Sequence, residues 1–163
     1  MKSKFSFWAY FVTGYAFIFS IILLFSITAD IIWNNILPFY FYIFVTIAVT
    51  FAWCWLVFGE LRKKIVLVEI GFDHFIIKRY LGFGSRVTLY FDQVAGYKVS
   101  YLYSRANTYE YLYLMVGDKK SVKLSEYYHR NYTALKEEII TAKINDLGVE
   151  DYSYLREIKE TFI

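Results

Sequence analysis

The sequence predicts a two-helix membrane hairpin followed by an α+β domain, and two features of the chain indicate it. Between Lys4 and Glu60 the only acidic or basic residue is Asp30, so two long apolar runs follow one another in the first third of the chain. Beyond Leu61 the apolar residues alternate in short runs separated by glycine and polar turns, which is typical of β-strands. The composition therefore divides the 163 residues into a membrane part and a water-soluble part.

Each apolar run is long enough to cross a bilayer. We expect spans at about 5–29 and 36–59, because about 20 helical residues cover a hydrocarbon core of about 30 Å. A cleaved secretory signal is the alternative for the first run, since Lys2 and Lys4 precede it and small residues around Ala29 resemble a cleavage site. The run is longer than the apolar core of a signal, and a second span follows at once. We therefore favour an uncleaved hairpin, which makes residues 1–60 a membrane domain.

Basic residues flank the two runs on one side only. Lys2 and Lys4 precede the first run, Arg62, Lys63 and Lys64 follow the second, and the connector between the runs has no Lys or Arg. Lys and Arg accumulate on the cytoplasmic side of membrane helices. We therefore expect a multi-pass membrane protein with both termini in the cytoplasm.

The second run begins with signals of a helix start and contains the single cysteine. Asn34 and Asn35 are good caps, and Pro38 suits a first helical turn. Cys54 has no second cysteine to pair with, so no intramolecular disulfide is expected.

Residues 61–146 predict a β domain closed by a helix. Ser125 has the character of a helix cap, and the residues from there to about 144 follow a helical period. After Asp146-Leu147-Gly148, the tail 147–163 is expected to carry a short amphipathic helix over about 150–162. The expected strands lie at 65–70, 74–80, 87–91, 97–103, 109–115 and 121–124. The fourth and fifth of these are expected to pair as a long hairpin.

A known class of domain shares several of these features. The features are the turn and strand Ile70-Gly71-Phe72-Asp73-His74-Phe75-Ile76-Ile77, the step Leu89-Tyr90-Phe91-Asp92-Gln93-Val94, and one amphipathic closing helix. Together they resemble the bacterial pleckstrin-homology-like (PH-like) domains that follow a pair of membrane helices, over about 63–145. The resemblance implies a bent antiparallel β-sandwich or open barrel, capped by a C-terminal helix and used for binding or scaffolding. The chain departs from the pattern in showing six strands instead of seven and in its tail beyond Gly148.

Tyrosines are concentrated in the fourth and fifth expected strands. Their alternation places the tyrosines of each strand on one face, and we expect the second strand to repeat the face of the first. Exposed rings would anchor a partner protein, whereas buried rings would be ordinary cross-strand core pairs. The polar loop end, from Tyr103 to Tyr109, is the part expected to be exposed. The candidates for partner binding are Tyr101, Tyr103, Tyr109 and Tyr111.

Basic residues near the second turn offer a different surface. They would be attracted to an anionic leaflet by about 1 kcal/mol each. The alternative is an orientation signal together with solvated strand edges, and we favour it. The candidates for an anionic surface are Lys63, Lys64, Lys78, Arg79 and Arg86.

The sequence offers no set of residues that would carry out catalysis or hold a metal or another cofactor. His74 and His129 lack neighbours with metal-ligand spacing, and Gly82-Phe83-Gly84 lacks the third glycine of a phosphate cradle. Basic residues outnumber acidic ones only slightly in the soluble part, which argues against nucleic-acid binding.

We therefore expect a scaffold at the inner membrane that binds a protein partner or itself and is not an enzyme. A lipid or envelope-state sensor that binds anionic headgroups through the basic residues is the alternative.

Overall fold

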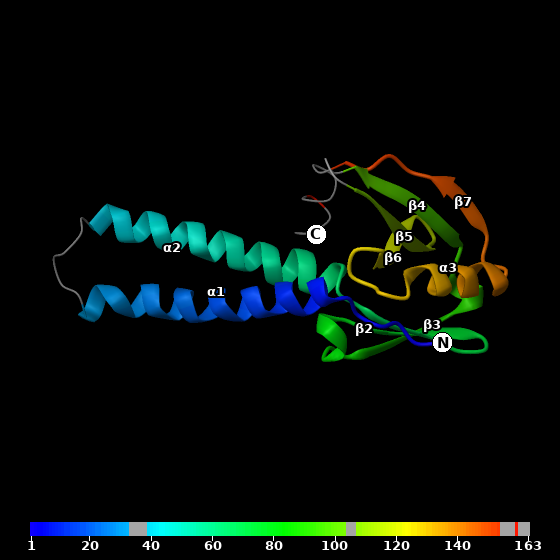
Figure 1. Ribbon diagram of the computed structural model, residues 1–163, viewed down its shortest axis with the longest axis horizontal. Coiled ribbons are helices and arrows are strands. Elements are labelled where there is room, and N and C mark those ends of the chain that lie inside the picture. Colours follow the sequence, from blue (N-terminus) through cyan, green and yellow to red (C-terminus); the bar gives the residue numbers. More distant parts are fainter. Residues whose placement is uncertain (33–38, 104–106, 154–158, 160–163) are drawn as a thin grey trace.

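The computed structural model describes residues 1–32, 39–103, 107–153 and 159, and Figure 1 shows a helical hairpin that projects from a β-rich domain. Helix α1 (Phe7–Ile32) packs against α2 (Phe39–Cys54), which continues into the π-helical turn η1 (Trp55–Leu61). The indole Nε1 of Trp53 donates to Ser20 Oγ at 2.7 Å and links the two helices. The two long apolar helices expected from the sequence are thus confirmed.

Both helices are long and apolar enough to cross a membrane. In the qualifying segments, Phe7–Ser26 and Tyr40–Leu61, only 11% and 0% of the residues in the most apolar window are buried within the protein. They are therefore not core helices of the β domain. The capping residues expected for the second helix, Asn34, Asn35 and Pro38, lie outside the described residues.

The first sheet contains three antiparallel strands in sequence order. It consists of β1 (Leu67–Ile70), β2 (His74–Lys78) and β3 (Arg86–Tyr90), and alternate side chains of β1 and β2 face the core. The second strand was expected to reach Tyr80, but it ends at Lys78 because the backbone turns into η2 (Tyr80–Gly82).

Val87 was expected to share the buried face of β3 with Leu89. Leu89 is buried, but the Val87 side chain is 49% exposed. β3 is an edge strand of its sheet, and its first three residues are exposed.

The second sheet has four strands in the order β6-β5-β4-β7. The expected long hairpin is confirmed as β4 (Gly96–Tyr103) and β5 (Thr108–Val116), followed by β6 (Lys119–Ser125). The expected end of the β domain at 146 is wrong, because the next residues form β7 (Asp146–Val149), which pairs parallel with β4. The domain therefore has a seventh strand that the sequence did not reveal. Of the tail helix expected over 150–162, residues 150–153 are not helical and nearly all the others lie outside the described residues.

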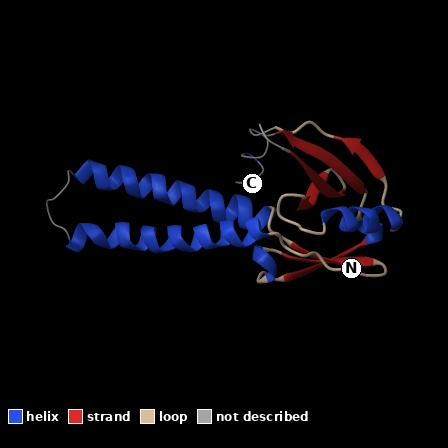
Figure 2. Ribbon diagram, viewed as in Figure 1, coloured by secondary structure: helices blue, strands red, loops and turns tan. Residues whose placement is uncertain are grey.

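Helix α3 (Tyr132–Thr141) lies between the two sheets (Figure 1). Its buried face of Tyr132, Leu135 and Ile139 packs into one core with side chains from both sheets. The helix was expected to begin after Ser125, but residues up to Asn131 form a loop that contacts the N-terminal segment. Figure 2 shows two open sheets with a helix between them, and the described residues form no closed barrel.

Candidate interaction surface

The tyrosines of the β4–β5 hairpin lie on two opposite faces of the sheet. The register pairs Tyr97 with Leu114 and Tyr101 with Glu110, so odd-numbered residues of β4 face the same side as even-numbered residues of β5. Tyr97 and Tyr101 therefore pack on the main core, whereas Tyr111 belongs to the opposite, outer face. The expectation that the tyrosines of both strands share one face is wrong.

The outer face of the second sheet carries a separate buried cluster. Tyr111, Tyr113 and Met115 are buried there, with Leu102 and Tyr152 packed against them. Two lysines of β6 lie above the rings. The ammonium of Lys123 is 4.1 Å from the centre of the Tyr111 ring, and that of Lys120 is 4.4 Å from the centre of Tyr113. A cation above an aromatic face is attracted by the ring quadrupole, so this surface is both apolar and electropositive.

An acidic and aromatic segment of the same chain occupies this outer face. After β7, the Glu150 amide donates to the Val99 carbonyl at 2.8 Å, which extends the pairing with β4. The Glu150 carboxylate accepts a hydrogen bond from Lys120 Nζ at 3.1 Å. The Tyr152 ring then stacks on Tyr111 with their centres 5.8 Å apart. We call Glu150-Asp151-Tyr152 the acidic–aromatic segment.

Two buried serines of this sheet flank Tyr111. Ser100 and Ser125 are the cross-strand neighbours of Tyr111 on its two sides. Both side chains are buried, and neither Oγ has a hydrogen-bond partner among the residues that the structure describes. A buried polar group without a partner costs about 1–3 kcal/mol. The acidic–aromatic segment therefore provides a partner for the Lys120 ammonium of this face but no hydrogen bond to the two serine hydroxyls.

The remaining tyrosine candidates lie near the end of the hairpin. Tyr103 is 75% exposed. Tyr109 meets the Tyr127 ring edge to face at 5.0 Å, and Tyr127 stacks on Trp8 of α1 at 5.4 Å. Trp8 and Tyr127 also line an apolar groove of about 700 Å³ between the two long helices. Aromatic contacts thus connect the sheet to the helical hairpin.

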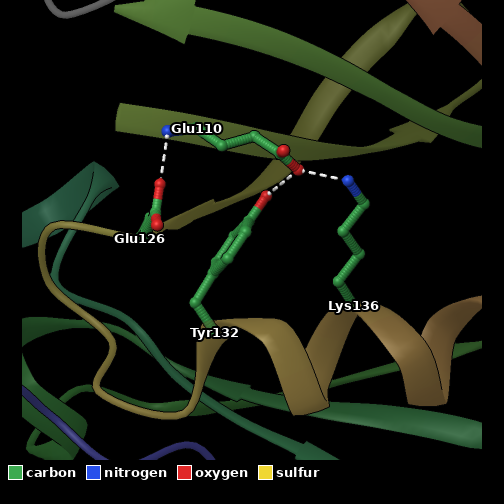
Figure 3. A network of polar contacts seen from close by, with 4 residues as sticks. All are labelled: Glu110, Glu126, Tyr132 and Lys136. Atoms are coloured by element: carbon green, nitrogen blue, oxygen red, sulfur yellow. Dashed lines mark hydrogen bonds and ion pairs between the residues drawn. The ribbon is translucent and has the colours of Figure 1, made fainter. Parts of the chain in front are cut away.

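On the inner face, Glu110 fixes α3 to the sheet (Figure 3). Its Oε1 accepts hydrogen bonds from the Tyr132 hydroxyl at 2.7 Å and from Lys136 Nζ at 2.6 Å. Its backbone amide donates to Glu126 Oε2 at 3.0 Å. Burial raises the pKa of Tyr132, and the hydrogen bond to Glu110 raises it further. Burial lowers the pKa of Lys136, but the hydrogen bond and charge of Glu110 outweigh this effect and the net shift is upward. These side chains are paired with one another and hold α3 against the sheet.

The N-terminal segment joins the helical hairpin to the first sheet. Ser3 donates its amide to Val68 O at 2.8 Å and accepts from the Val68 amide through its hydroxyl at 2.9 Å. Lys2 forms a 2.7 Å ion pair with Glu69. The sequence pattern did not predict this pairing, which covers the open edge of β1.

The loop before α3 holds the other side of the N-terminal segment. Asn131 accepts a hydrogen bond from the Lys4 amide at 2.7 Å and donates to Lys2 O at 3.1 Å. The His129 ring is buried, and its nitrogens lie 2.8 Å from Val66 O and 2.9 Å from Ser125 O. Burial lowers the pKa of His129, and the hydrogen bonds to these carbonyls only partly oppose the shift. His129 is thus a structural residue, and no group of three or more potential metal ligands occurs among the described residues.

The five basic candidates do not form one patch. Lys64 is buried and binds Glu60 at 2.6 Å. Lys78 and Arg86 are directly opposite each other in β2 and β3, and the neighbouring Arg79 is exposed. Lys63 is half-buried next to Lys64, after the end of η1. The structure therefore brings together Lys78, Arg79 and Arg86 and gives Lys64 a different role.

Sequence reasoning missed the residues that complete the outer face. Lys120, Lys123, Glu150 and Tyr152 had no role in the expected site, because only the register and the position of β7 bring them together. Comparison of the chain with protein-family models, curated proteins and solved structures found no match.

Proposed function

We propose that the chain is a membrane-anchored interaction module at the cytoplasmic face of a bacterial inner membrane, with no catalytic activity. Its two apolar helices span the bilayer, and its PH-like β domain binds an extended segment of a partner protein. The lack of burial along both helices and the basic residues at their domain ends support the membrane part. Two open sheets packed around α3 support the likeness to PH-like domains, whereas β7 departs from it, because β7 follows the helix and pairs parallel with β4.

The observation that carries the proposal is the acidic–aromatic segment on the outer face of the second sheet. Lys120 pairs with Glu150, and Tyr111 stacks with Tyr152, so the face recognises an acidic side chain and an aromatic ring two residues apart. The backbone bond from Glu150 to Val99 adds strand pairing. Extended peptides bind sheets through the same combination of main-chain bonds and side-chain contacts.

The internal segment would act as a competitor of the partner. A tethered segment has an effective concentration in the millimolar range when its linker is short. A partner must therefore have a higher affinity for the face than the internal segment in order to displace it. The hydroxyls of Ser100 and Ser125 give a partner a means of doing so, because each can accept or donate a hydrogen bond that the internal segment does not provide.

A peptide-binding measurement tests the proposal. A fluorescein-labelled peptide with the sequence of residues 146–153 is titrated with the full chain in lipid nanodiscs, and anisotropy is recorded. We expect weak binding to the native chain and clearly tighter binding to a Glu150→Ala, Tyr152→Ala variant, because the internal competitor is weakened. A peptide carrying the same two alanines should bind neither protein.

A third protein locates the site. Adding Lys123→Ala to the weakened variant removes the cation from the Tyr111 ring and should lower the affinity for the peptide severalfold. Lys119→Ala, at the exposed start of β6, is the matched control and should leave the affinity unchanged. The proposal is wrong if the weakened variant does not bind the peptide, or if both lysine variants bind it equally well.

A lipid sensor is the second candidate function, and the opposition of Lys78 and Arg86 favours it. Like charges directly opposite each other destabilise a sheet unless an anion lies between them. In this case Lys78→Ala or Arg86→Ala would change the binding of the full chain to anionic headgroups and leave the peptide titration unaffected.

A further inference from the structure

The turn between β2 and β3 lies beside the place where the two long helices enter the β domain. Figure 1 shows η2 next to the start of α1, whereas the turn between β1 and β2 lies at the far end of the sheet. Tyr80 and Leu81 pack against a cluster that contains Ala9 of α1 and Leu61 of η1. The Leu81 amide also donates to the Ile65 carbonyl at 3.0 Å. The turn is therefore fixed at the level of the helix ends.

An aromatic side chain projects from this turn without protein contacts to bury it. Phe83 is 89% exposed, although its neighbours Leu81 and Gly82 are half-buried. Such exposure of a large apolar side chain in a fixed turn is unfavourable in water.

The backbone of the turn produces this exposure. Tyr80, Leu81 and Gly82 all have positive φ angles, of 53°, 58° and 95°. Residues other than glycine rarely adopt positive φ angles, and those that do are found mainly at functional sites and switches. In this turn, the left-handed backbone directs the side chains of Tyr80 and Leu81 towards the cluster that contains Ala9 and Leu61, and the Phe83 side chain lies in solvent.

Positive charge surrounds Phe83. Lys78 and Arg86 are cross-strand neighbours at the base of the turn, and Arg79 is exposed between Lys78 and η2. None of these three residues forms an ion pair with a carboxylate in the part of the chain that the structure describes. Glu69 of β1 forms its ion pair with Lys2, which lowers the pKa of its carboxyl, and the charges of Lys78 and Arg86 lower that pKa further. The local charge thus matches an anionic surface.

We propose that residues 78–86 form a second membrane contact, in which Phe83 enters the interface of the cytoplasmic leaflet and Lys78, Arg79 and Arg86 bind its anionic headgroups. Aromatic side chains concentrate at the membrane interface, and basic residues near the leaflet are attracted by its negative potential. With the helical hairpin as the first contact, the turn fixes the rotation of the β domain about the hairpin. The inference rests on the membrane-spanning part of the proposed function and is independent of partner binding.

Site-specific fluorescence in vesicles tests the contact with the full chain. The single cysteine is first removed by Cys54→Ser, and the environment-sensitive dye NBD is attached through Phe83→Cys, Phe72→Cys or Phe44→Cys. Phe72, in the β1–β2 turn, is 100% exposed and is the matched control at the far end of the sheet. Phe44, on the exposed surface of α2, reports whether the hairpin is in the bilayer.

Quenching by aqueous iodide and by a lipid-borne nitroxide is measured in vesicles of phosphatidylglycerol mixed with phosphatidylcholine, and in phosphatidylcholine alone. In the anionic vesicles we expect position 83 to show a blue-shifted emission, severalfold less iodide quenching than position 72, and strong quenching by the lipid nitroxide. Combined Lys78→Ala, Arg79→Ala and Arg86→Ala substitutions, or pure phosphatidylcholine, should reduce this protection. Circular dichroism checks that each variant keeps its fold.

The outcomes separate the two proposals. If position 44 is protected but position 83 is as open to iodide as position 72, the second contact is wrong and the spanning hairpin stands. If position 44 is itself open to iodide, the spanning hairpin is wrong and the second contact falls with it. If position 83 is protected equally in both kinds of vesicle and in the triple variant, the binding of anionic headgroups is wrong.

Discussion

The hydroxyl of Tyr128, in the loop before α3, donates a 2.6 Å hydrogen bond to Oε2 of Glu60, at the end of the second long helix. The other carboxylate oxygen of Glu60 binds Lys64 Nζ at 2.6 Å. All three side chains are largely buried, and Tyr128 belongs to the same cluster as Ala9 and Leu61. The helical hairpin and the β domain therefore share a packed and hydrogen-bonded joint. These contacts fix the orientation of the helical hairpin relative to the β domain.

Removing this hydroxyl by Tyr128→Phe should destabilise the joint. A hydrogen bond to a charged group contributes about 1.5–3 kcal/mol, and we expect a loss of about 2 kcal/mol because Glu60 Oε2 loses the hydroxyl donor of Tyr128. Chemical denaturation in detergent, followed by circular dichroism, measures the change. Tyr103→Phe, which changes an exposed tyrosine, is the control and should be neutral within experimental error. Equal stability of the two variants would show that the bond does not hold the joint.

Stability should fall at alkaline pH because two buried tyrosines must stay protonated. Burial raises the pKa of Tyr128 and of Tyr132, and their carboxylate partners Glu60 and Glu110 raise both further. The pKa values of the folded state lie above the ordinary value of 10.0, so this stability is complete below pH 10 and is lost as the pH rises above it. Each group contributes a slope of about 1.4 kcal/mol per pH unit.

Denaturation curves between pH 8 and pH 11 test the alkaline prediction. The native chain should become less stable above pH 10, and a Tyr128→Phe, Tyr132→Phe variant should show a shallower decline, although it starts from a lower stability. A decline of the same steepness in both proteins would assign the effect to other groups.

Stability should also fall below pH 6.5, because the buried His129 must stay neutral in the folded chain. Burial lowers its pKa below the ordinary value of 6.5, so the unfolded chain binds a proton that the folded chain does not. This contribution is present above pH 6.5 and is lost as the pH falls through the lowered pKa. A neutral ring can donate to only one of the two nearby carbonyls.

The matched pair His129→Gln and His74→Gln tests the acidic prediction between pH 8 and pH 5. The first variant should be less stable at pH 8 and should lose less stability on acidification than the native chain. The second keeps His129 and should retain the native acid dependence. If the His74 variant instead loses that dependence, the assignment to His129 is wrong.

The helices and the long hairpin could be predicted because side-chain patterns define them directly. The two apolar runs, separated only by Asp30, are so long that they predict two long helices. Apolar and polar residues alternate over many positions in β4 and β5, which predicts the hairpin. By contrast, β7 has no buried side chain, and it is held by backbone pairing and by the close approach of Gly96 to Leu147. The segment Met1–Phe5 likewise pairs through backbone bonds and Ser3. Backbone pairing leaves no trace in hydrophobic periodicity.

The candidate site was only partly predictable for a related reason. The alternation within β4 and within β5 was read correctly, but the register between the strands pairs Tyr101 with Glu110, so the two tyrosine rows separate. A single residue of register decides the face of every side chain, and the loop that sets it gives no such signal. The exposure of Phe83 also depends on the positive φ angles of Tyr80, Leu81 and Gly82, which could not be predicted from the sequence.

The contact between Gly96 and Leu147 offers a prediction that links fold and function. A Cβ at Gly96 would lie 2.5 Å from both the Asn145 carbonyl oxygen and Leu147 Cγ, which is closer than atoms tolerate. Gly96→Ala should therefore push β7 away from β4 and loosen the acidic–aromatic segment that follows it. Hydrogen exchange of the Tyr97 and Glu150 amides, which pair β4 with this region, should accelerate.

Because the internal competitor is then weaker, the labelled peptide of residues 146–153 should bind the Gly96→Ala variant more tightly than the native chain. Gly14→Ala, at a position where a Cβ meets nothing within 4 Å, is the matched control and should change neither property. Faster exchange without tighter peptide binding would mean that the outer face does not serve as a peptide site even when it is uncovered.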